Sequence, residues 1–137
     1  MEISYRLKPY LQDKYEHKFF GILKDILSQE SHDWVILPQV QVGRIINMTC
    51  QPFSSKCEYY LFHGMNQLSF DYVIFNRALQ PLLAIELDGS THTKISRKRR
   101  DMFLEEICNE AQLPLLRVSL SNEYDTAVLK KNILEKM

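Results

Sequence analysis

The sequence predicts an α/β domain in which helices pack on a mixed central sheet of about four strands, in the order α-β-β-β-α-β-α. Three observations predict it. Apolar residues recur at three- and four-residue spacing in some segments and alternate or run together over strand lengths in others. The length of 137 residues corresponds to a single domain, residues 1–137.

The first half of the chain predicts one helix and one strand, followed by a segment without a clear secondary-structure pattern. A helix is expected from about Tyr10 to Ser28, with a stripe made of Tyr15, Phe19, Ile22, Leu23, Ile26 and Leu27. The β-branched stretch Asp33–Ile46 predicts a strand, and Pro38 inside it indicates an edge or a bend. Residues 47–66 match no pattern, so their structure and role stay open.

The second half predicts a β-hairpin followed by helix, strand and helix. Strands over Leu68–Asn76 and Pro81–Gly89 form the hairpin. A helix should begin at Ser96, a favoured N-cap residue, and run to Gln112. Its inner face would comprise Phe103, Leu104, Ile107, Cys108 and Ala111. A short strand over Leu113–Leu120 and a closing helix over Glu123–Met137 complete the order.

Composition limits the cellular context. Lys+Arg and Asp+Glu both number 17, so a nucleic-acid partner would have to be bound by a local basic patch. An odd set of three cysteines without a C-x-x-C pair favours a reducing cytoplasm, and the spacing of Cys50, Cys57 and His63 matches no common zinc site. No apolar run reaches the ~18 residues of a membrane span, so no membrane partner is expected.

The stretch "LLAIELDGSTH" carries the strongest chemical signal. Because side chains alternate along a strand, Glu86 and Asp88 should share one face, about 7 Å apart at Cα. Asp71 lies on the neighbouring strand between Phe70 and Tyr72. Three converging acids would raise one another's pKa, and a divalent cation such as Mg²⁺ or Mn²⁺ would relieve the repulsion.

Simpler interpretations exist for each piece. An acid at a strand end is usually solvated, and the pair Asp88-Gly89 is typical of a turn. A single loop histidine such as His92 is more often solvated than catalytic. The basic run Arg97–Arg100 can be a solvated helix face.

The combined pattern resembles the PD-(D/E)XK, or restriction-endonuclease-like, nuclease superfamily. More narrowly, "FDYVIFNRALQPLLAIELDGSTH" followed by "RRDMFLEEICNEAQLPLLRV" is similar to bacterial domains related to very-short-patch-repair endonucleases. The similarity covers Leu68–Val118 well. The helix carrying Glu16 fits more loosely.

The resemblance implies roles for individual residues. Asp71 and Glu86 would bind the metal, and the carbonyl of Leu87 would supply a third ligand. Asp88 stands where the superfamily has its namesake lysine, so it could be a further ligand or a base for water, but it cannot stabilise negative charge. His92 is the candidate general base or leaving-group partner, and Lys94 is an alternative source of positive charge.

The basic run lies at the start of a helix, where the macrodipole disfavours cations. Phosphate contacts would offset that cost, which makes Lys94, Arg97, Arg99 and Arg100 candidate nucleic-acid-binding residues. Arg117 is expected to be a structural partner of an acid in the sheet.

Two functions therefore compete. The first is a metal-dependent phosphodiesterase, an endonuclease acting on DNA or alternatively on RNA. The second is a non-catalytic nucleic-acid-binding or scaffolding module on the same fold, favoured by the missing lysine and the neutral net charge. A third, a protein-interaction domain with an acidic patch, has the least support. Targeting could come from a partner protein or an additional domain, and the sequence does not determine the oligomeric state.

Overall fold

The computed structural model describes residues 1–48, 67–89 and 95–137, and their strands form one four-stranded sheet. The strands are β1 (Val35–Gln41), β2 (Ser69–Phe75), β3 (Pro81–Asp88) and β4 (Leu115–Ser119), in that spatial order. β1 pairs with β2 and β2 with β3 in antiparallel fashion, whereas β3 and β4 are parallel. The predicted hairpin and the predicted mixed sheet are both confirmed.

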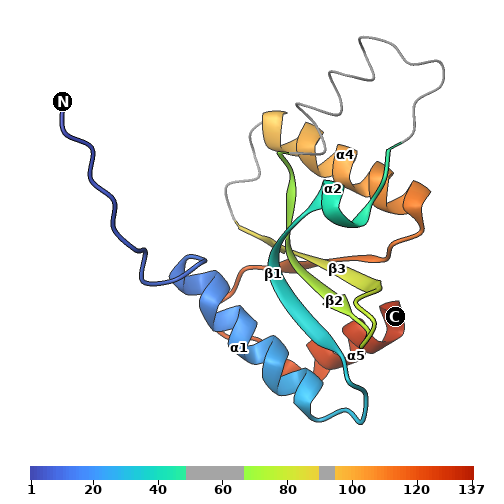
Figure 1. The fold of residues 1–137 in the computed structure, drawn as a ribbon. Helices are drawn as coiled ribbons and strands as arrows, with labels where there is room; N and C mark the ends of the chain where they lie inside the picture. Colours follow the sequence, from blue (N-terminus) through green and yellow to red (C-terminus); the bar gives the residue numbers. More distant parts are fainter. Residues whose placement is uncertain (49–66, 90–94) are drawn as a thin grey trace, which may run out of the picture.

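Helices cover the two faces of this sheet (Figure 1). They are α1 (Lys14–Ser28), α2 (Val42–Ile45), α4 (Ile95–Ala111) and α5 (Thr126–Lys136). α1 and α5 pack on one face, while α2 and α4 pack on the other, which gives three layers. Among the described helices, none combines the length and the apolar character needed to cross a membrane.

Side chains of the hairpin strands point alternately to the two faces of the sheet, so the hairpin contributes to the hydrophobic core on each face. Leu83 and Ile85 of β3 pack with α1 and α5, whereas Ala84 packs with α4. Glu86 follows Ala84 by two residues and therefore also faces the α4 side. The predicted division of β3 into two faces is thus confirmed, and it carries a carboxylate into an apolar layer.

Several predicted boundaries were wrong for local reasons. The first helix begins at Lys14, not Tyr10, because Asp13 caps it by accepting a hydrogen bond from the Glu16 amide at 2.9 Å. The strand predicted to reach Ile46 ends at Gln41, and the chain turns into α2. The helix predicted to start at Ser96 begins one residue earlier.

Two predicted core positions were also wrong. Tyr15 is exposed, and the partly buried Glu16 takes its place on the stripe that continues through Phe19 and Leu23. Ala111 is exposed near the end of α4. The prediction for Pro38 is confirmed, because β1 is an edge strand of the sheet.

Candidate active site

A cavity of about 340 Å³ lies where β2 begins and β3 ends, against the first turns of α4. Three residues predicted to bind metal, two predicted to contact phosphate and one further acid line it. Its lining consists of Asp71, Glu86, Leu87, Gly89, Arg97, Arg100 and Asp101.

Asp71 is positioned by the end of the strand ladder. The regular β2–β3 register extends to the pair Tyr72–Ile85. One residue beyond it, Oδ2 of Asp71 accepts a hydrogen bond from the backbone amide of Leu87 at 2.8 Å. This bond fixes the Asp71 carboxylate beside the end of β3 and therefore close to Glu86.

Glu86 is the buried acid of the site. Its side chain is only 4% exposed, and its Oε1 has no hydrogen-bond partner among the described residues. Burial, followed by repulsion from Asp71, raises the pKa of Glu86 to about 8, against the opposing influence of Arg100 and Arg117. The site therefore disfavours a charged Glu86 unless more positive charge is supplied.

The donor set fits a hard divalent cation. Mg²⁺ and Mn²⁺ prefer oxygen ligands, and they commonly bind one or two carboxylates with water completing the shell. An unpartnered, buried carboxylate oxygen beside a second carboxylate is such a partial set. Within the described ranges, however, no group of three His, Cys, Asp or Glu side chains is close enough to share an ion.

Asp88 does not line the cavity, although it was predicted to converge with the other two acids. Its Oδ1 lies 3.3 Å from Nη1 of Arg117 on β4. The structure therefore brings Asp71 and Glu86 together but directs Asp88 toward a cation. The prediction that Arg117 pairs with an acid of the sheet is confirmed.

Arg117 ties the sheet to α4. Its Nε donates to Oε1 of Glu105 at 2.9 Å, and its Nη2 donates to the carbonyl of Asp101 at 3.1 Å. A further contact joins Nη1 to Oδ1 of Asp101 at 3.5 Å. These bonds hold the start of α4, and with it the basic run, over the acids.

The basic run divides into two pairs. Arg97 and Arg100 line the cavity, whereas the exposed Lys98 and Arg99 do not. Arg100 is partly engaged, because its Nη2 donates to the Ser69 carbonyl at 3.4 Å. Its Nη1 also lies 3.7 Å from Asp101. Arg97 and Arg100 therefore give the cavity two cationic side chains beside its acids.

Several predicted residues lie outside the described part of the chain. His92 and Lys94 fall in residues 90–94, and the cysteine–histidine combination of Cys50, Cys57 and His63 falls in residues 49–66. The roles predicted for His92 and Lys94 stay predictions.

Glu16 lies near Asp71, although no role was predicted for it from the sequence. Burial, then the charges of Asp71 and Asp13, raise its pKa. Its Oε2 accepts a hydrogen bond from Nε2 of Gln39 at 3.0 Å. The sequence offered one signal for Glu16: a carboxylate on the apolar stripe of an amphipathic helix. Burial of an unpaired charge there is unfavourable, so charged residues are rare at such positions.

Two contacts hold Glu16 in place. The hydroxyl of Tyr72 donates to the backbone carbonyl of Glu16, which anchors α1 to β2. Gln39 adopts a φ of 53°, a left-handed conformation that non-glycine residues seldom take. The strained residue falls at the one position that the β1–β2 pairing skips, between the pairs Pro38–Tyr72 and Val40–Phe70, and the register is the same on both sides of it.

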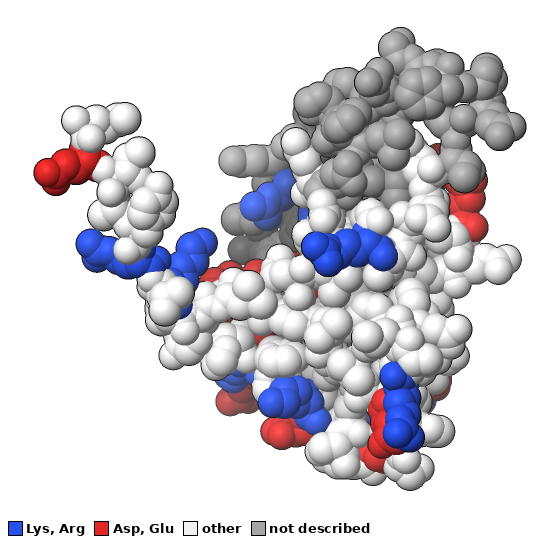
Figure 2. Space-filling view, in the orientation of Figure 1, with Lys and Arg blue, Asp and Glu red and all other residues white. Residues whose placement is uncertain are grey.

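Charge on the surface is dispersed on the face seen in Figure 2. Blue and red side chains there form small separate groups among white atoms. This agrees with the formal net charge of zero. Electrostatic binding would therefore depend on local features such as the turn that carries Arg97 and Arg100.

Residues 8–137 match the family described as "Protein of unknown function (DUF2726)". The chain belongs to this family. No curated protein matches it. No solved structure matches it either.

Proposed function

We propose that this member of the DUF2726 family is a phosphodiesterase that cleaves DNA and depends on Mg²⁺ or Mn²⁺. One observation carries the proposal: the buried carboxylate of Glu86, whose Oε1 has no hydrogen-bond partner among the described residues, lies beside Asp71 in a cavity also lined by Arg97 and Arg100. The arrangement pairs a cation-binding centre with an anion-binding rim, which is what hydrolysis of a phosphodiester requires.

We further propose that the sheet and its helices form a restriction-endonuclease-like core. Support comes from the order of the elements and from the place of the two acids, one on each strand of the central hairpin. The superfamily resemblance predicts both features.

Asp71 and Glu86 would hold the metal, with the Leu87 carbonyl as the predicted third protein ligand. When bound, the metal would polarise the phosphate and lower the pKa of a water molecule. Arg97 and Arg100 would orient the phosphate by charge-assisted hydrogen bonds. His92 stays the predicted general base.

The missing lysine needs a substitute in this proposal. Asp88 occupies that position and is paired with Arg117. Arg100 lines the cavity, and its charge acts on Glu86. We assign to Arg100 the stabilisation of negative charge that a lysine would otherwise provide.

Because Asp88 stands where the superfamily has its lysine, a second candidate is also supported. It is a nucleic-acid-binding or scaffolding module without catalysis. Such a protein would bind DNA through the same basic rim and leave it uncut. We place either activity in the cytoplasm, as the cysteine content predicts, with targeting supplied by a partner protein or an additional domain.

The deciding experiment is DNA cleavage by purified protein in Mg²⁺, in Mn²⁺ and in EDTA. Wild type should nick or cut DNA only with the metals, and Asp71→Asn and Glu86→Gln should each abolish cleavage. The matched control is Asp33→Asn, which neutralises an exposed acid near the opposite end of the hairpin and should keep full activity. DNA binding without cleavage in the presence of Mg²⁺ or Mn²⁺ would favour the second candidate, and cleavage by both site variants would refute the assignment.

A further inference from the structure

The first eight residues form an amphipathic segment that buries none of its apolar side chains. Its apolar residues occupy every second position, a period of two that is typical of a strand with one buried face. Ile3, Tyr5 and Leu7 are 65%, 90% and 98% exposed. A run of exposed side chains of this size usually marks an interaction surface.

This N-terminal arm, residues 1–8, leaves the domain and extends away from the sheet (Figures 1 and 2). Contacts at the start of α1 determine the direction in which the arm leaves the domain. The ring of Tyr10 packs on that of His17 with centroids 4.4 Å apart, and Asp13 caps the helix. These contacts direct the arm outward rather than back over its own sheet.

Among the described strands, β1 and β4 form the two edges of the sheet, and they differ in how well they could accept a further strand. β1 forms one edge, where Pro38 lacks an amide hydrogen and Gln39 has a positive φ of 53°. Both features interrupt a continuous row of hydrogen-bonding groups. β4 forms the other edge and contains neither proline nor lysine, and no described strand pairs with its outer side.

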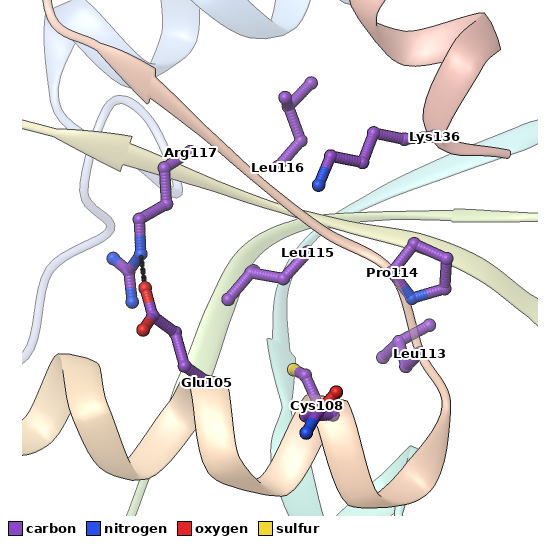
Figure 3. Close-up of a pocket in the computed structure, with 9 residues that line it drawn as sticks. Glu105, Cys108, Leu113, Pro114, Leu115, Leu116, Arg117 and Lys136 are labelled. Atoms are coloured by element: carbon purple, nitrogen blue, oxygen red, sulfur yellow. Dashed lines mark hydrogen bonds and ion pairs between the residues drawn. The ribbon is translucent and has the colours of Figure 1, made fainter.

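Two cavities follow the outer edge of β4. One of about 530 Å³ lies between α4 and the end of α5, and Figure 3 shows Lys136 of α5 and Glu105 of α4 on opposite sides of the strand. The other, of about 230 Å³, lies between β4 and α5. Together they include all five residues of β4 in their linings.

The two sides of this edge differ in chemistry. On the α5 side lie Leu116, Val118 and Val128, and Val128 is 51% exposed. On the α4 side, Glu105 and Asn109 present polar groups. An added strand with one apolar and one polar face would match both sides.

We propose that the N-terminal arm of a second copy of this chain adds to β4 as a fifth strand. Its odd-numbered apolar residues would lie under α5, and Arg6 and Lys8 would face the α4 side, where Glu105, which also pairs with Arg117, carries the opposite charge. Reciprocal exchange of arms would give a closed two-fold dimer in which each arm pairs with the partner sheet. This association is independent of the proposed nuclease activity.

The test compares paired variants by sedimentation equilibrium of the full chain over a dilution series. Wild type should sediment at twice 16.2 kDa and dissociate on dilution. The double variant Ile3→Asn, Tyr5→Asn should raise the dimer dissociation constant at least about tenfold, because apolar interface contacts are lost. The control Glu2→Asn, Ser4→Asn alters the polar face of the same segment and should change it far less.

The docking site has its own pair of variants. Val128→Asn on α5 should weaken the dimer to a similar extent, whereas Leu134→Asn, which is exposed on the same helix and lines neither cavity, should not. Hydrogen exchange should show every second amide within residues 3–7 protected in the dimer, because only alternate amides of an added strand face β4, and these should be unprotected after dilution.

Three results would overturn the proposal. The first is a monomer at every concentration with rapidly exchanging arm amides. The second is a monomer whose arm amides are protected, since the arm would then cover its own sheet. The third is a dimer weakened by the arm variants but not by Val128→Asn, because the arm would then dock elsewhere.

Discussion

The stability of the metal-free protein should fall as Glu86 ionises, and Glu86→Gln should remove that dependence. The pKa of Glu86 is raised from 4.5 to about 8 by burial and by Asp71. Between these two values the folded state holds a proton that the unfolded state has released. Stability is therefore fully present below about pH 4.5 and decreases as the pH rises toward about 8.

The magnitude follows from the size of the shift. One pKa unit corresponds to about 1.4 kcal/mol. Moving from about pH 5 to about pH 9 crosses roughly three units of the window, so the free energy of unfolding should fall by about 4 kcal/mol through this one group. Glutamine keeps the side-chain volume without a charge, so any cost of its unpaired amide is independent of pH.

The assay is urea denaturation in EDTA at several pH values, with the stability of Glu86→Gln compared with that of wild type. The free energy of unfolding of Glu86→Gln, measured relative to that of wild type, should rise by about 4 kcal/mol between about pH 5 and about pH 9. Asp33→Asn, the exposed control, should show a nearly constant difference. A Glu86→Gln difference that stays within about 1 kcal/mol across the range would refute the raised pKa and the strained pair.

Adding Mn²⁺ at the high-pH end of this range tests whether Asp71 and Glu86 bind a metal ion. A cation bound only by the native state stabilises wild type by about 2.7 kcal/mol at a hundredfold excess over its dissociation constant. Glu86→Gln should lose most of that gain. Equal stabilisation of both proteins would mean that the acids do not form the metal site.

Three further predictions concern the surroundings of the pair. Arg97→Gln and Arg100→Gln should each lower the salt dependence of DNA binding by about one released counterion. The control Arg77→Gln at the hairpin turn should leave this salt dependence unchanged. Equal salt dependence in all three variants would mean that the basic run Arg97–Arg100 is only a solvated helix face. Arg117→Met should lower the free energy of unfolding by about 2 kcal/mol in urea titrations, because it removes the guanidinium that contacts Asp88, Asp101 and Glu105. Tyr72→Phe should cost about 1 kcal/mol by removing its hydrogen bond to α1, and an unchanged midpoint would contradict that anchoring role.

The sequence by itself determined the elements whose pattern is local. The alternation in β3 predicted which side chains enter each core, because neighbouring residues of a strand must point to opposite faces. The nearness of Asp71 and Glu86 was also predictable, since two strands joined by a short turn pair as neighbours. Helix ends were less predictable, because the cap at Asp13 outweighed the apolar residues that precede it.

Only the tertiary structure decided the chemistry of those residues. Asp88 and Arg117 meet because β3 and β4 run parallel across the intervening helix, which brings together residues 29 positions apart. Glu16 approaches Asp71 from a helix on the opposite face of the sheet, a contact that no local spacing encodes. Whether Glu86 is solvated or strained depends on what covers it. Desolvation is a property of the surrounding layers, so the raised pKa of Glu86 arises only when α4 closes over the end of the hairpin.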